Sequence, residues 1–296
     1  MPVIDRKDML KGLTVAEAMR RQVVSLATHA PLEQAIRFSI KYKVNAILVS
    51  DVRQHAQGVV TKTDLMGAYY AGLPLDAPVE AIMVGPPLFC CKEDSLGTAL
   101  DTMRSQHIHR LYVYGEDPRR AEGVLACPDI VGLLYRFCRR CNRSILRKKG
   151  GGTERDLAGH LTVREVMTPG VESLSEDQSL LEVMAGLAAT RLAAVLIRGA
   201  NGRASGVVSK TDLIIAYKHG LPYETPAREV MSAPVRACRQ DDFLAWAIEH
   251  MIFWDIHRLF VARNESQEMV GVLSLSDAAR FRSGTCRACL VSRIAV

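Results

Sequence analysis

The chain carries an internal duplication without gaps. The segment GVVTKTDLMGAYYAGLP at 58–74 returns as GVVSKTDLIIAYKHGLP at 206–222, so that equivalent residues lie 148 positions apart. The same offset joins four further pairs, which are Met19 with Met167, Pro74 with Pro222, Met83 with Met231 and His109 with His257. A repeat of this length and regularity predicts two equivalent domains that fold in the same way.

The duplication also predicts where the domains begin and end. It takes in residues 12–148 and 160–296. We therefore expect a first domain at 1–148 and a second at 159–296, joined by a linker at 149–158. Adjacent glycines and charged residues in this linker favour a flexible connection.

Each half is itself double. Four apolar runs that start with Gly-Val-Val or Gly-Val-Leu each lead to an aspartate, and they begin at Gly58, Gly123, Gly206 and Gly271. Hydrophobic spacing within a unit predicts the order strand, helix, strand, strand, helix, which is an α/β (α+β) fold. The four units cover about 12–75, 76–140, 160–223 and 224–288. Because a unit this small buries little apolar area, we expect the units to pair into two modules.

Composition places the chain in a broad class. The 296 residues are 48% hydrophobic and 24% charged, and no apolar run reaches the roughly 18 residues of a membrane span. The start MPVIDRKDML lacks the apolar core of a signal peptide, so we expect a cytoplasmic protein that does not bind membranes. Much of the net charge of +6 comes from RFCRRCNRSILRKK at 136–149. Since no recognition motif accompanies this tract, it favours a solvated linker or support for a polyphosphate over nucleic acid binding.

At this point the chain resembles the cystathionine-beta-synthase (CBS) domain family, whose tandem pairs are called Bateman modules. Four opening segments of the form V-x-x-x-M or its variant carry the resemblance, at Val15 to Met19, Val79 to Met83, Val163 to Met167 and AREVM at 227–231. The four closing segments are GVVTKTD, GVLACPD, GVVSKTD and GVLSLSD. The resemblance implies a regulatory module that binds adenosine-containing ligands between paired units and has no chemistry of its own.

The closing segments offer groups that suit such a ligand. An aspartate in the first turn of a helix can accept hydrogen bonds from both hydroxyls of a ribose, which suits Asp64, Asp212 and Asp277. Nearby hydroxyls at the positive end of the same helix can donate to phosphate oxygens, and they belong to Thr61, Thr63, Ser209, Thr211, Ser274 and Ser276. The alternative is that these residues only cap their helices.

A second phosphate-binding feature stands before a strand in units two and four. HIHRLYV and DIHRLFV place His109-Arg110 and His257-Arg258 at matching positions. Arginine offers forked donors to a phosphate, and histidine adds a donor that depends on pH. The chain resembles here the gamma subunit of AMP-activated protein kinase, which implies that these pairs contact nucleotide phosphates. A solvated arginine and a capping histidine remain the alternative.

The four clefts are expected to be unequal. In unit two, Ala126 replaces a hydroxyl and Pro128 removes a backbone N–H, so Asp129 lacks its companions and we predict poor phosphate binding. Units one and three have no His-Arg pair. Their phosphate contacts would have to come from the partner unit.

The cysteines form a separate pattern. C-x-x-C occurs twice at the same offset, as Cys138 with Cys141 and Cys286 with Cys289. Four thiolates predict a metal site, for which zinc fits best. An iron–sulfur cluster held by the same four is possible, with Cys90 and Cys238 as extra candidates. Reversible dithiols and buried structural thiols are the alternatives.

These features favour one function over two others. We expect a regulatory protein, not an enzyme, that binds AMP, ADP or ATP, acts on a protein target of unknown identity and forms a homodimer. No phosphate loop or hydrolase motif supports an enzyme. A metal or redox sensor built on the cysteines is the other alternative. Trp246 and Trp254 in FLAWAIEHMIFW are expected in the core or at a module interface.

Overall fold

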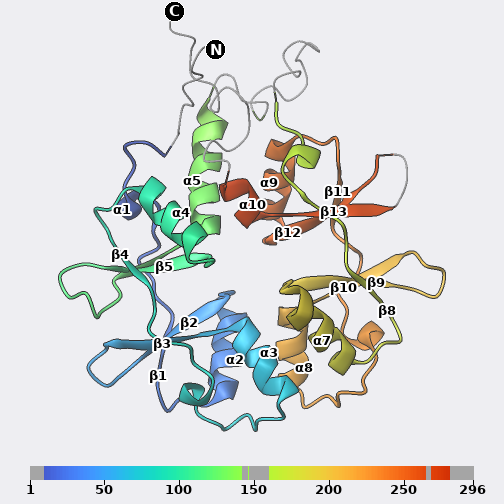
Figure 1. Ribbon diagram of the computed structural model, residues 1–296, viewed down its shortest axis with the longest axis horizontal. Coiled ribbons are helices and arrows are strands. Elements are labelled where there is room, and N and C mark those ends of the chain that lie inside the picture. The colour runs from blue at the N-terminus through green and yellow to red at the C-terminus, as the bar shows by residue number, and fades with distance from the viewer. Residues whose placement is uncertain (1–9, 142–145, 147–159, 265–267, 281–296) are drawn as a thin grey trace, which may run out of the picture.

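The computed structural model describes residues 10–141, 146, 160–264 and 268–280. Its elements follow the predicted order in each unit, which confirms the α/β (α+β) fold class (Figure 1). The first half contains α1 (Val15–Ala18), β1 (Ser25–Ala27), α2 (Leu32–Lys41), β2 (Ala46–Ser50), β3 (Ala56–Thr61), α3 (Lys62–Tyr70), η1 (Val79–Ala81), β4 (Phe89–Cys91), α4 (Leu96–Ser105), β5 (Arg110–Tyr114), β6 (Gly123–Ala126) and α5 (Cys127–Arg140). The second half contains η3 (Val163–Glu165), β7 (Thr168–Pro169), β8 (Ser173–Ser175), α7 (Leu180–Thr190), β9 (Ala194–Arg198), β10 (Ala204–Ser209), α8 (Lys210–Lys218), η4 (Ala227–Glu229), β11 (Ala237–Arg239), α9 (Leu244–Phe253), β12 (Arg258–Ala262), β13 (Met269–Ser274) and α10 (Leu275–Ala279).

Each unit builds one small sheet in the same way. The first two strands pair in parallel with a helix between them, and the third returns antiparallel, as in β1-β2-β3. The sheets β4-β5-β6, β8-β9-β10 and β11-β12-β13 repeat this arrangement, and β7 adds a fourth strand beside β13. A helical crossover is what a parallel pair requires, while a short loop suffices for the antiparallel return.

Contacts between glycine and methionine explain why the units pair. A side-chain carbon at Gly58 in unit one would lie 2.8 Å from the sulfur of Met83 in unit two. The same contact recurs three times, with Gly123 against Met19, Gly206 against Met231 and Gly271 against Met167, at 2.9, 2.6 and 2.8 Å. The methionine of each opening segment therefore packs where its partner unit has no side chain. The two family motifs are the two sides of one contact, and they join unit one to two and unit three to four.

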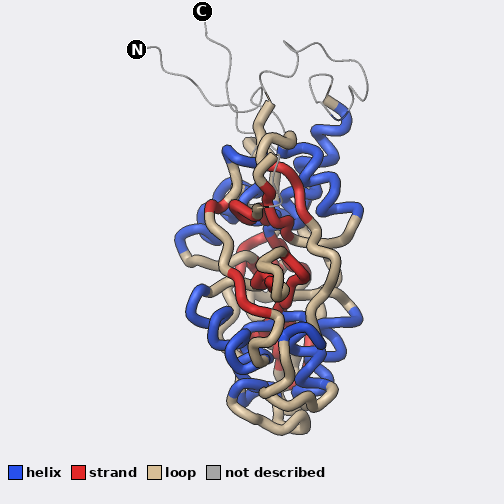
Figure 2. The backbone as a smooth tube through the Cα atoms, turned by 90° about the vertical axis from the view of Figure 1, so that its right-hand side faces the viewer, coloured by secondary structure: helices blue, strands red, loops and turns tan. Residues whose placement is uncertain are grey.

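The two modules, residues 10–141 and 160–280, pack against each other through their helices. One buried cluster combines apolar residues of units one and three, and a second combines those of units two and four. Helix α3 lies against α8, where the rings of Tyr69 and Tyr217 stack 5.1 Å apart, and α5 lies against α10. Figures 1 and 2 show that the four sheets surround a common centre in a flattened body. Closing segments from all four units therefore point toward the middle of the molecule.

The expectation for the two tryptophans was wrong. Trp246 is 37% exposed and Trp254 is 40% exposed. Helix α9 has apolar residues on every side, and such a pattern suggests a wholly buried helix. In this chain only one side of α9 faces the core, through Leu244, Ile248 and Met251.

Candidate ligand-binding site

The aspartates that close the units cap their own helices. Asp64 Oδ2 accepts hydrogen bonds from the backbone N–H and the hydroxyl of Thr61, both at 2.7 Å. The same two bonds join Ser209 to Asp212 at 2.7 and 2.6 Å, and Ser274 to Asp277 at 2.9 and 2.6 Å. In unit two, Ala126 provides only a backbone bond to Asp129, at 2.8 Å. Capping is therefore real in all four copies, but in each it occupies one carboxylate oxygen.

The second carboxylate oxygen distinguishes the copies. Within the described residues, Asp64 Oδ1 has no hydrogen bond or ion pair. Asp212 Oδ1 accepts a hydrogen bond of 3.1 Å from the Ser232 hydroxyl. Asp277 Oδ1 lies 3.8 Å from a guanidinium nitrogen of Arg280, which is a loose contact. These three carboxylates thus keep an oxygen that a sugar hydroxyl can reach.

Unit two differs because its aspartate, Asp129, forms an ion pair with an arginine. Arg20 Nε lies 2.9 Å from Asp129 Oδ1, and burial raises the pKa of Asp129 even with this cation beside it. Thr168 stands at the position equivalent to Arg20 in the second module. An ion pair within the chain therefore takes the carboxylate oxygen that a ribose would need, and this is a further difference between unit two and the other three units.

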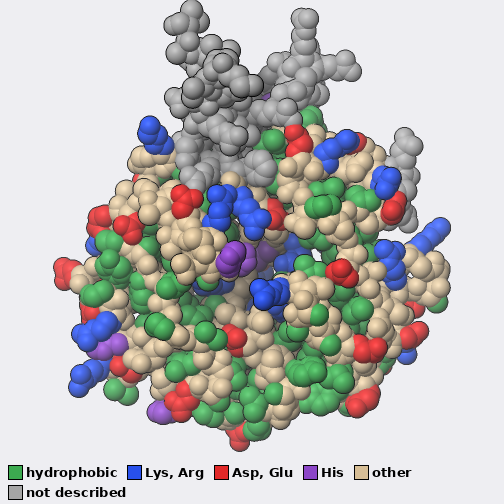
Figure 3. Space-filling view, in the orientation of Figure 1, with side chains coloured by type: hydrophobic (Ala, Val, Ile, Leu, Met, Phe, Trp, Pro, Cys, Tyr) green, Lys and Arg blue, Asp and Glu red, His purple; other side chains and the backbone are tan. Residues whose placement is uncertain are grey.

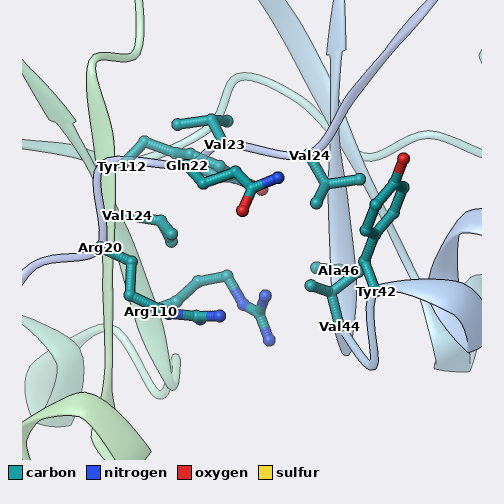
Figure 4. Close-up of a pocket in the computed structure, with 10 residues that line it drawn as sticks. All are labelled: Arg20, Gln22, Val23, Val24, Tyr42, Val44, Ala46, Arg110, Tyr112 and Val124. Atoms are coloured by element: carbon teal, nitrogen blue, oxygen red, sulfur yellow. The ribbon is translucent and has the colours of Figure 1, made fainter.

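A pocket of about 100 Å³ lies beside this ion pair. Figure 4 shows Arg20 and Arg110 on one side of it and Tyr42 on the other. Its lining residues are Arg20, Gln22, Val23, Val24, Tyr42, Val44, Ala46, Arg110, Tyr112 and Val124. They come from the segment before β1 and the connection from α2 to β2 in unit one, and from β5 and β6 of unit two, so the pocket is a cleft between paired units.

Cationic side chains from all four units lie close together near the centre. They are Lys62, Arg110, Lys210 and Arg258, and the imidazoles of His109 and His257 lie among them. Burial is the main cause that lowers the pKa of all six groups, which favours the neutral form of the two imidazoles at neutral pH. Neighbouring cations lower several of these pKa values further, for example Arg110 beside Lys62 and Arg258 beside Lys210. Figure 3 shows histidine, lysine and arginine side chains around a hollow in this face. Cations that repel one another in a partly desolvated place form a site for a polyanion.

Two lysines exchange contacts between the modules. Lys62 Nζ donates to the Thr211 hydroxyl oxygen, and Lys210 Nζ donates to that of Thr63, each at 2.8 Å. The repeated K-T-D segments therefore meet across the pseudo-twofold axis. Electrostatic contacts also join Lys62 to Asp212 and Lys210 to Asp64, each from the opposite module. Two of the six hydroxyls predicted to meet phosphate, those of Thr63 and Thr211, are therefore held by lysine, which is a better phosphate ligand, and those of Thr61, Ser209 and Ser274 donate to the aspartate of their own helix.

A further set of contacts joins unit one to unit four. The loop after α2 ion-pairs Lys43 with Asp255, and the Asn45 amide lies 3.2 Å from Nδ1 of His257. At the equivalent positions of units three and two stand Arg191 and His107, which cannot form a pair of opposite charge. This ion pair therefore joins units one and four, whereas the equivalent described positions of units two and three cannot form one.

The predicted site residues thus fall into two groups. Asp64, Asp212, Asp277 and the two His-Arg pairs lie around the centre, whereas Asp129 is neutralised. Ser276 lies beside the Cys127 thiol of unit two. Sequence reasoning missed Lys62 and Lys210, although their place in both copies of K-T-D was a usable signal. It also missed Arg20, because nothing in the sequence connects it to a residue more than 100 positions away.

Only one of the two C-x-x-C pairs, Cys138 with Cys141, lies within the described residues. Cys138 is buried in the core shared by units two and four, and Cys141 ends α5. Cys286 and Cys289 lie outside the described residues, so the four-thiolate site stays a prediction. Burial raises the pKa of Cys90 and of Cys238 to about 12, which keeps both thiols protonated at neutral pH. Within the described ranges, no group of three potential metal ligands occurs.

Membrane insertion finds no support in the helices. In the part of the chain that the structure describes, none combines the length and the apolar character that a membrane crossing requires.

Comparisons with known proteins identify the repeated unit. The model of the CBS domain family matches residues 15–71, 79–136, 163–219 and 227–284. A protein of Methanocaldococcus jannaschii, described as a proposed archaeal homologue of g-AMPK, has a TM-score of 0.75 at 15% identity, covering 91% of this chain and 99% of its own. A conserved protein of Pyrococcus horikoshii has a TM-score of 0.59 at 17% identity, covering 91% and 100%. Both therefore share the whole four-unit fold.

One shorter match comes with a ligand in its structure. It is a CBS domain protein of Pyrobaculum aerophilum complexed with AMP, 23% identical, with a TM-score of 0.38 over 40% of this chain and 90% of its own. A comparison with curated proteins finds no match.

Proposed function

The chain belongs to the CBS domain family, with four repeats, and we propose that it is a regulatory protein that binds adenosine nucleotides and has no catalytic activity of its own. The observation that carries this proposal is the convergence of cations from all four units on a centre beside three carboxylates, each with one oxygen that does not cap its helix. Cations need an anion of several charges, and carboxylates need hydroxyl donors. A nucleotide such as AMP, ADP or ATP offers both.

The residues have distinct proposed roles. Asp64, Asp212 and Asp277 bind ribose hydroxyls through the oxygen that capping leaves available. His109 with Arg110, and His257 with Arg258, bind phosphates. Lys62 and Lys210 add the phosphate contacts that units one and three lack in their own sequence.

The Asp129 cleft takes no part in ribose binding under this proposal. Releasing Asp129 from Arg20 would leave two charges to be solvated again in a partly buried cleft, which costs more than one sugar contact returns. Three of the four clefts are therefore expected to bind nucleotide.

Ligand occupancy is proposed to reach a protein target through the contacts between modules. A phosphate that binds Lys62 or Lys210 competes with Thr211 or Thr63 of the opposite module, so binding changes how the modules are held together. We further propose that the protein is a cytoplasmic homodimer, and that the linker at 149–158 separates the two domains.

A thermal-shift screen with AMP, ADP, ATP, S-adenosylmethionine and NAD tests the proposal. At least one adenosine ligand should raise the melting temperature, and Asp212→Ala and Lys210→Met should each reduce that rise. Asp129→Ala is the matched control, because its carboxylate is already neutralised and the rise should persist. A wild-type protein that responds to none of these ligands refutes the proposal.

The cysteine pairs remain a second, separate proposal. Cys138, Cys141, Cys286 and Cys289 would hold zinc or, less simply, an iron–sulfur cluster. Metal analysis of protein purified with and without oxygen should find one bound metal site per chain. Absence of zinc and iron from both preparations would leave the structural interpretation of these thiols.

A further inference from the structure

The pocket beside the Asp129 ion pair has more cations than anions around it. Both of the charged residues that line it are arginines, Arg20 and Arg110. Asp129 lies next to the pocket and is bound to Arg20, and its charge also acts on Arg110. Two guanidinium groups therefore share one carboxylate, and one positive charge is left without a counter-charge.

Arg110 is the guanidinium with the unmatched charge. Among the described residues it forms no ion pair, and burial is the largest cause that lowers its pKa. Lys62 lies close enough for the two cations to repel each other. A partly desolvated cation without an anion is unfavourable, so an anionic group that reached Arg110 would be stabilised there.

The rest of the pocket wall is mostly apolar. Its aliphatic side chains belong to Val23, Val24, Val44, Ala46 and Val124. Figure 4 shows Val23 and Val24 along one edge of the pocket and the guanidinium groups along another. A ligand that fits must therefore have an apolar body next to its charged group, which is the usual composition of a small-molecule site.

The volume of the pocket limits the size of this body. A cavity of about 150 Å³ holds one benzene molecule, so a pocket of about 100 Å³ has room for roughly four to six non-hydrogen atoms. A purine base is larger than that. A carboxylic acid with a short aliphatic chain fits, and its planar carboxylate matches the forked donors of a guanidinium.

The second module lacks both properties at the equivalent positions. Thr168 stands where the first module has Arg20, and Glu172 stands where it has Val24. The backbone bond at this point is the same in both modules. An N–H of β2 donates to the carbonyl of Val24 at 3.0 Å, and an N–H of β9 donates to that of Glu172 at 3.2 Å. An apolar side chain at residue 24 is therefore not a requirement of the fold, and a carboxylate in its place would repel an anion.

We propose that this pocket binds a short aliphatic carboxylate. The carboxylate accepts hydrogen bonds from Arg110, and the aliphatic chain packs against Val23, Val24 and Val44. Arg110 has several N–H donors, so one edge of its guanidinium can meet this carboxylate while another meets a phosphate at the centre. The site goes beyond the proposed function, because it uses the cleft that takes no part in ribose binding and does not require a nucleotide.

Saturation-transfer NMR with isobutyrate and without nucleotide tests this proposal. The methyl signals of isobutyrate should show a saturable response with wild-type protein. Isobutyramide, which has the same shape without the charge, should show none, and acetate should bind about tenfold more weakly because it lacks two carbon atoms. Wild-type protein that does not bind isobutyrate, or that binds isobutyramide equally well, overturns the proposal.

Variants at two positions test whether the ligand binds in this pocket. Val24→Glu carries the residue of the second module, and its carboxylate should pair with Arg110 and reduce the affinity for isobutyrate by about 30-fold or more. Val24→Gln is the matched control, which has nearly the same size without the charge and should lose less than about fivefold. Arg110→Met should abolish binding by a different route, since it removes the cation. Isobutyrate binding that persists in Arg110→Met, or in folded Val24→Glu, overturns the proposal.

Either proposal can fail without the other. The nucleotide screen contains no aliphatic carboxylate, and the isobutyrate titration contains no nucleotide. Protein that binds a nucleotide but not isobutyrate therefore overturns only the carboxylate site, and the reverse result overturns only the proposed function.

Discussion

The second unit of the first module and the second unit of the second module began from the same duplicated sequence and differ most at the ligand position. Unit four keeps Ser274, Ser276 and Asp277 with Thr168 beside the cleft. Unit two has Ala126 and Pro128, and its Asp129 is paired with Arg20. Both units have the same order of elements, and in both the aspartate caps the start of the last helix. The two units thus share the same order of elements, while the side chains predicted to meet a ligand differ between them.

The largest predicted effect is on the free energy of unfolding, and it tests whether the Gly–Met contact is equally important in both modules. Gly58→Ala and Gly206→Ala should each destabilise the protein by about 1–3 kcal/mol, since the new methyl group would overlap the methionine of the partner unit. Urea denaturation measures the loss.

Gly132→Ala is the control for this prediction. Gly132 lies within helix α5 and has no neighbouring atom within 4 Å of an added carbon. Alanine should therefore stabilise the protein there by about 0.5–1 kcal/mol. A large loss of stability from Gly58→Ala and none from Gly206→Ala, or the reverse, would show that the two modules are not equivalent.

The next prediction converts unit four to the state of unit two. Thr168→Arg should place a guanidinium against Asp277, as Arg20 lies against Asp129. Nucleotide affinity should fall by about 10- to 100-fold, because an internal ion pair then competes with the ribose. Titration calorimetry measures the change. Thr168→Met has similar length without the charge and should have a small effect; equal losses in both variants would indicate simple obstruction.

The reverse exchange should have a smaller effect. Arg20→Thr frees the second oxygen of Asp129, but Ala126 and Pro128 still remove a hydroxyl and an N–H. We expect one additional weak binding event, strengthened when Ala126→Ser and Pro128→Ser are added. If the triple variant binds no more nucleotide than wild type, the ion pair does not explain the difference between the clefts.

The smallest predicted effect concerns pH. Burial, followed by the charges of Arg110 and Lys62 respectively, lowers the pKa of His109 and of His257 below the usual 6.5. The unfolded chain then binds more protons than the folded chain, so ligand-free protein should lose stability as the pH falls through about 6.5 and keep it above. Because solvent still reaches part of both side chains, the change in melting temperature should be only about 2 °C.

A double variant and a ligand test the origin of this pH dependence. His109→Gln with His257→Gln should flatten the curve of melting temperature against pH. Bound ATP should flatten it as well, since a phosphate favours the charged imidazole. A steeper pH dependence in the double variant would contradict the assigned cause.

Much of the fold could be predicted from the sequence because its evidence is local and repeated. The order of elements and the four units follow from periodicity, and the four aspartates follow from one motif. The glycine and methionine motifs were recognised as family signatures, yet their mutual contact became evident only in three dimensions.

The contacts that decide function could not be predicted because they join distant parts of the chain. Lys62 meets Thr211 and Arg20 meets Asp129 only once the modules have formed. Helix α9 illustrates the opposite error. Its apolar sequence indicated burial, but the hydrophobic pattern alone does not tell which apolar face of the helix packs against the core.

Counting nucleotide sites by titration calorimetry tests directly whether the Asp129 cleft differs from the other three. The ligand selected by the thermal-shift screen should bind to Asp129→Ala with the same stoichiometry and affinity as to wild type. Asp277→Ala should lose one of the binding events. Equal losses from both variants, or a loss from Asp129→Ala alone, would contradict the claim that the two modules carry unequal clefts on one shared frame.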